Sequence, residues 1–195
     1  GDFENYYSTM SYEAEAQIVR ELGKFLLDGS LYQGFKPVLW STVEKTALAD
    51  AEVEYLDHTS NTIYAAFKVK ETKKEFLNDT NIIIWTTTPW TIPSNKTVAF
   101  NKSINYGLYE IEEVQDESWA QPKNNIILAD KLAEQTMEKS RVTKYKKIRD
   151  LSLEDLDDIT LSHPFAKLEG AESFWDYAVP LVEGDHVTDD VGTGF

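Results

Sequence analysis

The stretch of the sequence that could do chemistry is WTTTPWTIPSN, residues 85–95, where three threonines follow one another at the end of an apolar run. Each threonine hydroxyl can both donate and accept a hydrogen bond, so Thr86, Thr87 and Thr88 could hold a polar ligand without carrying net charge. Pro89 removes a backbone donor and stops the preceding strand from continuing. The cluster therefore predicts the rim of a pocket for a small polar molecule.

Neighbouring side chains fit the same pocket. Trp85 and Trp90 would supply apolar walls, and Asn95 would supply a fixed amide. The residues alone leave an alternative of similar weight, because threonine is a good strand residue. In that case the cluster is a strand end or a β-bulge in which the hydroxyls satisfy their own backbone. No acid–histidine pair lies beside the threonines, so none of them is an activated nucleophile.

The composition excludes several other kinds of chemistry. The chain has no cysteine, which removes disulfides, thiolate metal sites and cysteine nucleophiles. Its three histidines, His58, His163 and His186, are far apart and lack metal-ligand spacing. No apolar run approaches the roughly 18 residues of a membrane span, and no glycine-rich nucleotide loop is present. We therefore expect a monomeric, cytoplasmic protein without a membrane partner and without ATP chemistry in this chain.

Charge is unevenly distributed along the sequence. The formal net charge is −15, which does not suggest a basic nucleic-acid groove over the whole molecule. Residues 139–149 nevertheless contain six basic residues and no acid. They are interpreted either as a solvated helix end with a loop, or as a small phosphate-contacting patch. In the second case Lys144, Lys146 and Lys147 are the candidate contacts.

The elements that would hold these residues follow from hydrophobic periodicity. Helical spacing covers residues 11–27 and 130–140, with Ser11 and Asp130 as N-caps. Strand patterns cover residues 36–40, 62–69, 81–88, 98–100, 106–114, 125–129 and 181–195. Strands without regular βαβ alternation predict an α+β fold, with a curled or barrel-like, mainly antiparallel sheet and flanking helices.

The string WTTTPWTIPSN resembles the threonine-rich signature of the editing domain shared by isoleucyl-, valyl- and leucyl-tRNA synthetases. Further strings match landmarks of that domain in the same order: GFKPVLWS at 34–41, TALADAEVEY at 46–55, NIILA at 125–129, HPF at 163–165, GDHVT at 184–188 and GTGF at 192–195. The ALADAEVEY and GDHV strings favour the isoleucyl branch. Together the matches cover nearly the whole chain.

The resemblance implies hydrolysis of tRNA that carries the wrong amino acid, with valine as the error in the isoleucyl branch. Thr86, Thr87 and Thr88 would line the pocket and position the ester and a water, and Asn95 would help hold the aminoacyl-adenosine end. The partner would be the 3′ end of an isoleucine tRNA. No cofactor is expected in such a domain, since ATP and magnesium would belong to the separate catalytic core of the parent ligase.

The string GTGF resembles the start of the family motif G-T-G-x-V-H, which implies that Gly192, Thr193 and Gly194 contact the substrate. The histidine of that motif and a following aspartate, which hold the amino group of the substrate, would lie beyond Phe195. His186 belongs to the GDHVT string and is expected to be structural or superficial.

The same resemblance predicts the organisation of the chain. Residues 1–55 would be an N-terminal helix and a connecting ribbon leading from the catalytic core. Residues 56–195 would be the editing domain, truncated at its C-terminal end, so that the chain alone would be weakly active or inactive. The alternative is a non-catalytic module that binds a tRNA end or an aminoacyl-adenosine.

Overall fold

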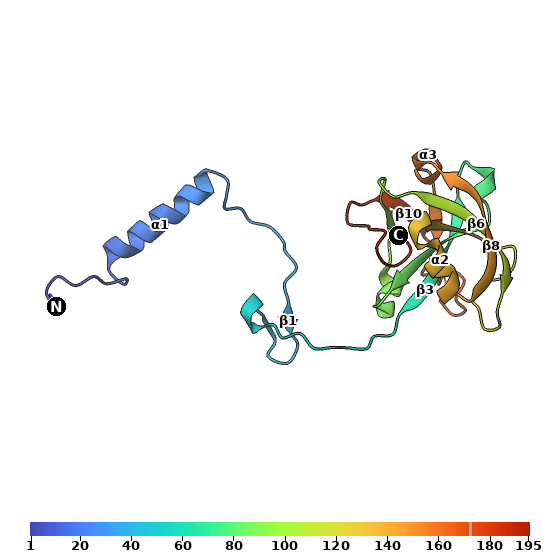
Figure 1. Cartoon of the computed structure of the whole chain (residues 1–195). Helices are drawn as coiled ribbons and strands as arrows, with labels where there is room; N and C mark the ends of the chain where they lie inside the picture. The colour runs from blue at the N-terminus through green and yellow to red at the C-terminus, as the bar shows by residue number, and fades with distance from the viewer. Residues whose placement is uncertain (172) are drawn as a thin grey trace. The chain divides into compact units, whose positions relative to one another are not determined.

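The computed structural model describes residues 1–171 and 173–195, which form two compact units, Gly1–Asp57 and His58–Phe195. Helix α1, Tyr12–Leu27, belongs to the first unit (Figure 1). The side chain of Ser11 caps it by accepting a hydrogen bond from the amide of Ala14 at 3.3 Å. The predicted helix is confirmed, but its apolar face is open, since Ile18 is 59% exposed and Phe25 55% exposed.

The rest of the first unit has little regular structure. Strand β1, Trp40–Ser41, pairs with β2, Thr46–Ala47, in a short antiparallel hairpin, and a 3-10 turn, η1, covers Asp50–Glu52. The strand predicted over residues 36–40 is therefore wrong except at Trp40. Pro37 has no amide hydrogen to donate to a ladder, and pairing with β2 begins only at Trp40.

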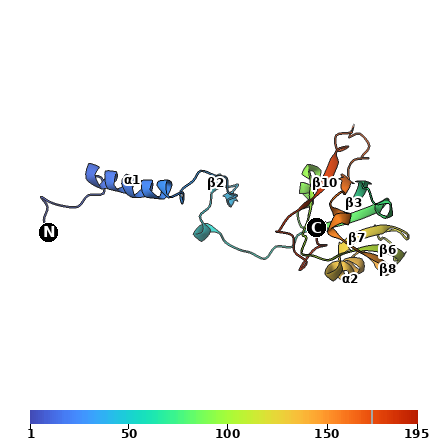
Figure 2. The same cartoon turned by 90° about the horizontal axis from the view of Figure 1, so that it is seen from above.

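The second unit contains one eight-stranded sheet in the order β5-β10-β9-β3-β4-β7-β6-β8. Figures 1 and 2 label β3, β6, β8 and β10 of this sheet. The strands are β3, Ile63–Glu71; β4, Thr80–Thr86; β5, Val98–Phe100; β6, Tyr106–Val114; β7, Asn125–Ala129; β8, Val142–Leu151; β9, Thr160–Ser162; and β10, Ala178–Glu183. Pairing is antiparallel except between β4 and β7 and between β10 and β5. The predicted class, a mixed fold with a mainly antiparallel sheet, is confirmed.

Short helices complete this unit. They are α2, Asp130–Lys139; α3, Leu153–Leu156; and two 3-10 segments, η2, Glu75–Leu77, and η3, Pro89–Ser94. Helix α2 packs on β7 and β8 through its predicted inward face, which includes Leu132 and Met137. Figure 2 shows it beside these strands.

Strand β4 is buried on both faces, as its sequence predicted. Ile82 and Ile84 join one apolar cluster with Phe67 of β3, and Ile83 joins a second cluster with Met137 of α2. Burial of such side chains stabilises the fold by about 1.5–3 kcal/mol each. The strand is therefore a rigid base for the threonines at its carboxyl end.

Three other predictions need correction. Asp130 is the first helical residue and not the cap; its carboxylate instead accepts a hydrogen bond from Tyr109 at 2.7 Å. Residues 142–151 are an edge strand paired with β6, and not a helix end with a loop. The sequence did not indicate this strand, because most of its side chains face solvent and show no apolar alternation. The predicted strand over 181–195 begins earlier and ends at Glu183, after which turns and irregular segments follow.

Candidate functional site

The chain turns sharply where β4 ends. Thr86 is the last strand residue and pairs with Ile63 of β3. The amide of Thr88 then donates to the Thr86 hydroxyl oxygen at 3.0 Å, and Pro89 begins η3. Thr91, one turn further, donates its hydroxyl to the carbonyl of Thr88 at 2.7 Å. Local hydrogen bonds between hydroxyls and backbone therefore fix the turn.

A cavity of about 200 Å³, which we call the threonine cavity, lies against this turn. Its lining residues are Ile84, Trp85, Thr86, Thr91, Ile92, Asn95, Thr97, Val98, Ala99 and Phe195. Six of the ten lining residues are apolar, and three hydroxyls and one amide supply polar groups, a combination typical of sites for small ligands. Of the residues singled out in the sequence, Trp85, Thr86 and Asn95 line this cavity.

The hydroxyls around the cavity differ in what they can still do. Because the Thr86 oxygen already accepts from the amide of Thr88, its own O–H remains able to donate. Thr91 and Thr97 donate their protons to the carbonyls of Thr88 and Pro180, at 2.7 and 2.9 Å, which leaves their oxygens able to accept. The cavity therefore combines one hydroxyl donor with two hydroxyl acceptors.

Other predicted site residues lie outside the cavity lining. The hydroxyls of Thr87 and Thr88 approach each other at 3.3 Å, and Thr87 is exposed. Trp90 is 75% exposed. The structure does not bring these three side chains to the cavity with Thr86, and the roles assigned to them stay predictions.

The segment of Gly192, Thr193 and Gly194 lies next to the cavity without lining it. A side chain at Gly192 would begin 3.6 Å from the ring of Trp85. The carbonyl of Thr193 accepts from the amide of Ala129 at 3.0 Å, which ties the segment to the end of β7. Its neighbour Phe195 does line the cavity. This places the segment beside the turn that follows Thr86, and its contact with a substrate stays a prediction.

Sequence reasoning missed the side chains that hold η3 in place. Three carbonyls of this turn accept hydrogen bonds from aromatic residues more than seventy positions away. His163 bonds to the carbonyl of Ile92 at 2.8 Å, Trp175 to that of Pro93 at 2.8 Å and Tyr177 to that of Asn95 at 2.7 Å. We call these three residues the aromatic clamp. Of the three, only His163 belongs to a string that resembles the family, HPF at 163–165.

His163 is the centre of the aromatic clamp. It is 2% exposed, and its ring stacks on Trp175 with centroids 6.0 Å apart and an angle of 13° between the planes. A carbonyl can only accept, so Nε2 donates to Ile92, while Nδ1 accepts from the amide of Phe165 at 3.1 Å. Both ring nitrogens make these hydrogen bonds, which assigns His163 a role in positioning η3.

The lysines proposed from sequence for phosphate contacts lie on β8, at one edge of the sheet, and each has acidic partners. Lys144 contacts Glu112 at 3.1 Å and Lys146 contacts Glu110 at 3.0 Å, both across the β6–β8 ladder. Lys147 contacts Asp130 at 2.8 Å and also Asp150. Neighbouring carboxylates thus neutralise much of the positive charge of this strand.

Other acid and imidazole groups form no metal site. Within residues 1–171 and 173–195, no three His, Cys, Asp or Glu side chains lie close enough to hold a metal ion. His186 is exposed, and Asp189 and Asp190 contact Lys131 at 3.0 and 3.3 Å. No helix within residues 1–171 and 173–195 is long and apolar enough to cross a membrane.

The geometry is that of a curled-sheet domain in which a threonine-bearing strand end borders a small, partly polar cavity. A family model described as class I tRNA synthetases (I, L, M and V) matches residues 1–166, so the chain belongs to that family.

Individual relatives narrow the comparison. The chain is 53% identical over 194 residues to an isoleucine–tRNA ligase of Pelagibacter ubique, and 49% identical over 195 residues to one of Bradyrhizobium diazoefficiens. These matches cover 100% of the chain but 20% and 19% of the relatives, so it spans about a fifth of their length. The resemblance to the isoleucyl branch is confirmed.

Among solved structures, one described as GlLeuRS-CP1 matches 68% of the chain and 52% of its own chain, with a TM-score of 0.48 and 14% identity.

Proposed function

We propose that the chain is an editing domain of an isoleucine–tRNA ligase, and that within such a ligase it provides the site where the ester that joins valine to an isoleucine tRNA is hydrolysed. Family membership and the names of the relatives support the parent activity. The observation that carries the hydrolytic role is the cavity, where the donor Thr86 and the acceptor Thr91 lie among apolar walls.

The need for such a step is energetic. Valine lacks one methylene of isoleucine, which is worth only about 1–3 kcal/mol of discrimination in a synthetic site. A second site that accepts valine and excludes the larger isoleucine side chain supplies the rest of the discrimination. The cavity of about 200 Å³, walled by Ile84, Ile92 and Val98, suits a small branched side chain.

The polar groups match an α-amino ester. In the proposed complex the Thr86 hydroxyl donates to the ester carbonyl, and the oxygens of Thr91 and Asn95 accept from the ammonium group. Water adds to the carbonyl carbon, the bond to the ribose oxygen breaks, the amino acid leaves and the tRNA recovers its hydroxyl. No covalent enzyme intermediate is required, so catalysis rests on placement and on hydrogen bonding to the developing oxyanion.

Replacing Thr86 with valine tests the proposal, because Thr86→Val removes the hydroxyl and keeps the branched shape. We expect hydrolysis of Val-tRNA to fall by roughly a hundredfold, the typical effect of losing one oxyanion donor. Thr143→Val, on the exposed side of β8, is the matched control and should retain the rate.

The adjacent variant Thr87→Val separates the cavity from the threonine run as a whole. Because Thr87 is exposed and does not line the cavity, we expect a smaller loss than for Thr86→Val. A rate that survives Thr86→Val would contradict the hydrolytic role. Binding of a valyl-adenosine analogue without any hydrolysis would make the chain a binding module.

A further inference from the structure

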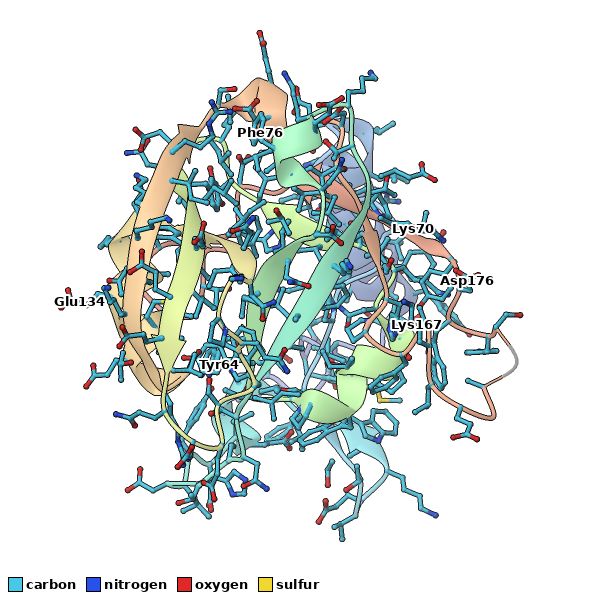
Figure 3. The ribbon with its side chains drawn as sticks, turned by 90° about the vertical axis from the view of Figure 1, so that its right-hand side faces the viewer. Tyr64, Lys70, Phe76, Glu134, Lys167 and Asp176 are labelled. Carbon is cyan, nitrogen blue, oxygen red and sulfur yellow. The ribbon has the colours of Figure 1, made fainter. Side chains whose placement is uncertain are left out.

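A second and larger cavity, of about 510 Å³, lies beside β3 and β9. Its lining residues are Ala66, Lys68, Val69, Lys70, Ser162, His163, Pro164, Ala166, Lys167 and Asp176. Figure 3 shows Lys70, Lys167 and Asp176 on the same side of the molecule. We call it the lysine cavity. Three bases and one acid among its lining residues give it a positive balance in an acidic chain.

The lysines of this cavity are available to an anion. Lys68 contacts Asp79 at 2.8 Å and Lys70 contacts Asp176 at 3.0 Å. Both pairs are solvent-exposed, and such pairs contribute little to stability, so a phosphate oxygen can replace the carboxylate. Lys167 has no ion pair within residues 1–171 and 173–195.

The lysines of β8 contrast with this arrangement. There, three bases meet five carboxylates, those of Glu110, Glu112, Glu113, Asp130 and Asp150. A polyanion that approached β8 would meet a net negative cluster, whereas at the lysine cavity bases outnumber acids. The structure therefore favours the lysine cavity for phosphate contacts.

The lysine cavity also adjoins the threonine cavity through the aromatic clamp. His163 lines the lysine cavity and bonds to the carbonyl of Ile92, which lines the threonine cavity. Asp176 of the lysine cavity lies in sequence between Trp175 and Tyr177, which hold the same turn. The two cavities are therefore bordered by residues that contact each other directly.

We propose that Lys68, Lys70 and Lys167 bind backbone phosphates of the RNA whose aminoacylated end enters the threonine cavity. The identity of the polyanion as RNA rests on the proposed function. The contacts themselves are sequence-independent, since lysine ammonium groups meet phosphate oxygens as point charges.

The test uses the triple variant Lys68→Gln, Lys70→Gln and Lys167→Gln of the whole chain. Binding of an isoleucine tRNA transcript is followed by fluorescence anisotropy between about 50 and 200 mM salt. We expect affinity at low salt to fall at least about tenfold, and the slope of log K against log salt to decrease by about 2–3, close to one per lost contact.

The matched comparison is Lys102→Gln, Lys144→Gln and Lys146→Gln, which makes the same change in net charge at lysines that contact carboxylates. Because none of these three lysines lines the lysine cavity, we expect this variant to change the slope by less than about 1. Equal effects of the two triple variants would overturn the proposal, because they would reflect overall charge alone.

Two further results would also overturn it: no binding of the transcript by the wild-type chain, or inorganic phosphate bound through the three lysines while the RNA slope is unchanged. Hydrolysis of Val-tRNA is measured in parallel. If the wild-type chain hydrolyses Val-tRNA but the triple variant has an unaltered salt slope, the proposed phosphate site is wrong and the editing function stands. If the slope falls as expected but the wild-type chain does not hydrolyse Val-tRNA, the phosphate site stands and the editing function is wrong.

Discussion

At the scale of single residues, three identical neighbours occupy three different environments. Thr86 ends β4 and lines the threonine cavity, Thr87 is exposed, and Thr88 offers its carbonyl to the hydroxyl of Thr91. The residue types predicted a pocket beside the threonines, where the structure has a cavity, but not which hydroxyl reaches it. That choice depends on where the strand ends and how the following turn is bonded, which a run of like residues does not encode.

Gly194 illustrates how closely the backbone packs beside this site. Its φ is +88°, and an added Cβ would lie 2.4 Å from that of Ala129. We expect Gly194→Ala to lower the free energy of unfolding by about 2–4 kcal/mol, combining the cost of positive φ with overpacking. Urea denaturation measures the change.

The control is Gly170→Ala. Gly170 also has positive φ, +79°, but nothing within 4 Å of the added carbon, so the expected loss is only about 1–2 kcal/mol. Equal losses for the two variants would show that packing against Ala129 contributes nothing.

At the scale of elements, periodicity predicted the covered strands well. The bounds expected for β5, β6 and β7 coincide with those observed, because the sheet and its flanking layers bury these strands and their apolar residues mark them. Strand β8 was missed because an edge strand rich in lysine shows no such pattern, although charged edges are a common protection against aggregation.

The aromatic clamp could not have been predicted either. Its side chains contact carbonyls of η3, and a carbonyl is present at every residue, so no residue type in residues 89–95 identifies the partner. The contacts join parts of the chain separated by 71 and 82 residues. Such pairings follow from the topology of the whole sheet and leave no local trace in the sequence.

The variant Tyr177→Phe tests whether the aromatic clamp positions the site. It removes one hydroxyl donor to Asn95 and keeps the ring, over which Lys96 lies at 3.8 Å. We expect a loss of about 1 kcal/mol in the free energy of unfolding. Hydrolysis of Val-tRNA should fall severalfold in kcat, because η3 and its C-cap carry three of the cavity-lining residues, Thr91, Ile92 and Asn95.

Tyr64→Phe is the matched control, since the Tyr64 hydroxyl makes no hydrogen bond within the described parts of the chain. It should change neither quantity appreciably. A loss of stability in Tyr177→Phe with kcat unchanged would limit the aromatic clamp to a structural role.

At the scale of the whole molecule, the arrangement of charge matters more than its sum. The chain carries a formal charge of −15, yet Lys144 and Lys146 are paired across β6 and β8, while the lysine cavity keeps a positive balance. The pairs on β8 extend to Lys147, Asp130 and Tyr109, where they join the edge strand to the start of α2. Stability should therefore depend on pH through this network.

The alkaline limit of stability provides the test. Burial raises the pKa of Tyr109, which is 5% exposed, and its hydrogen bond to Asp130 raises that pKa further. The folded protein thus keeps this proton to higher pH than the unfolded chain, in which tyrosine ionises near pH 10. The stabilisation is complete below about pH 10 and is lost as pH rises toward the folded pKa, at up to about 1.4 kcal/mol per pH unit.

Tyr109→Phe should be less stable at pH 7, through loss of its bond to Asp130, but should lose stability less steeply between about pH 10 and 11.5 in urea titrations. Part of the slope should persist, because burial also raises the pKa of Tyr106. Parallel curves for variant and wild type would show that the Tyr109 proton does not contribute to this limit.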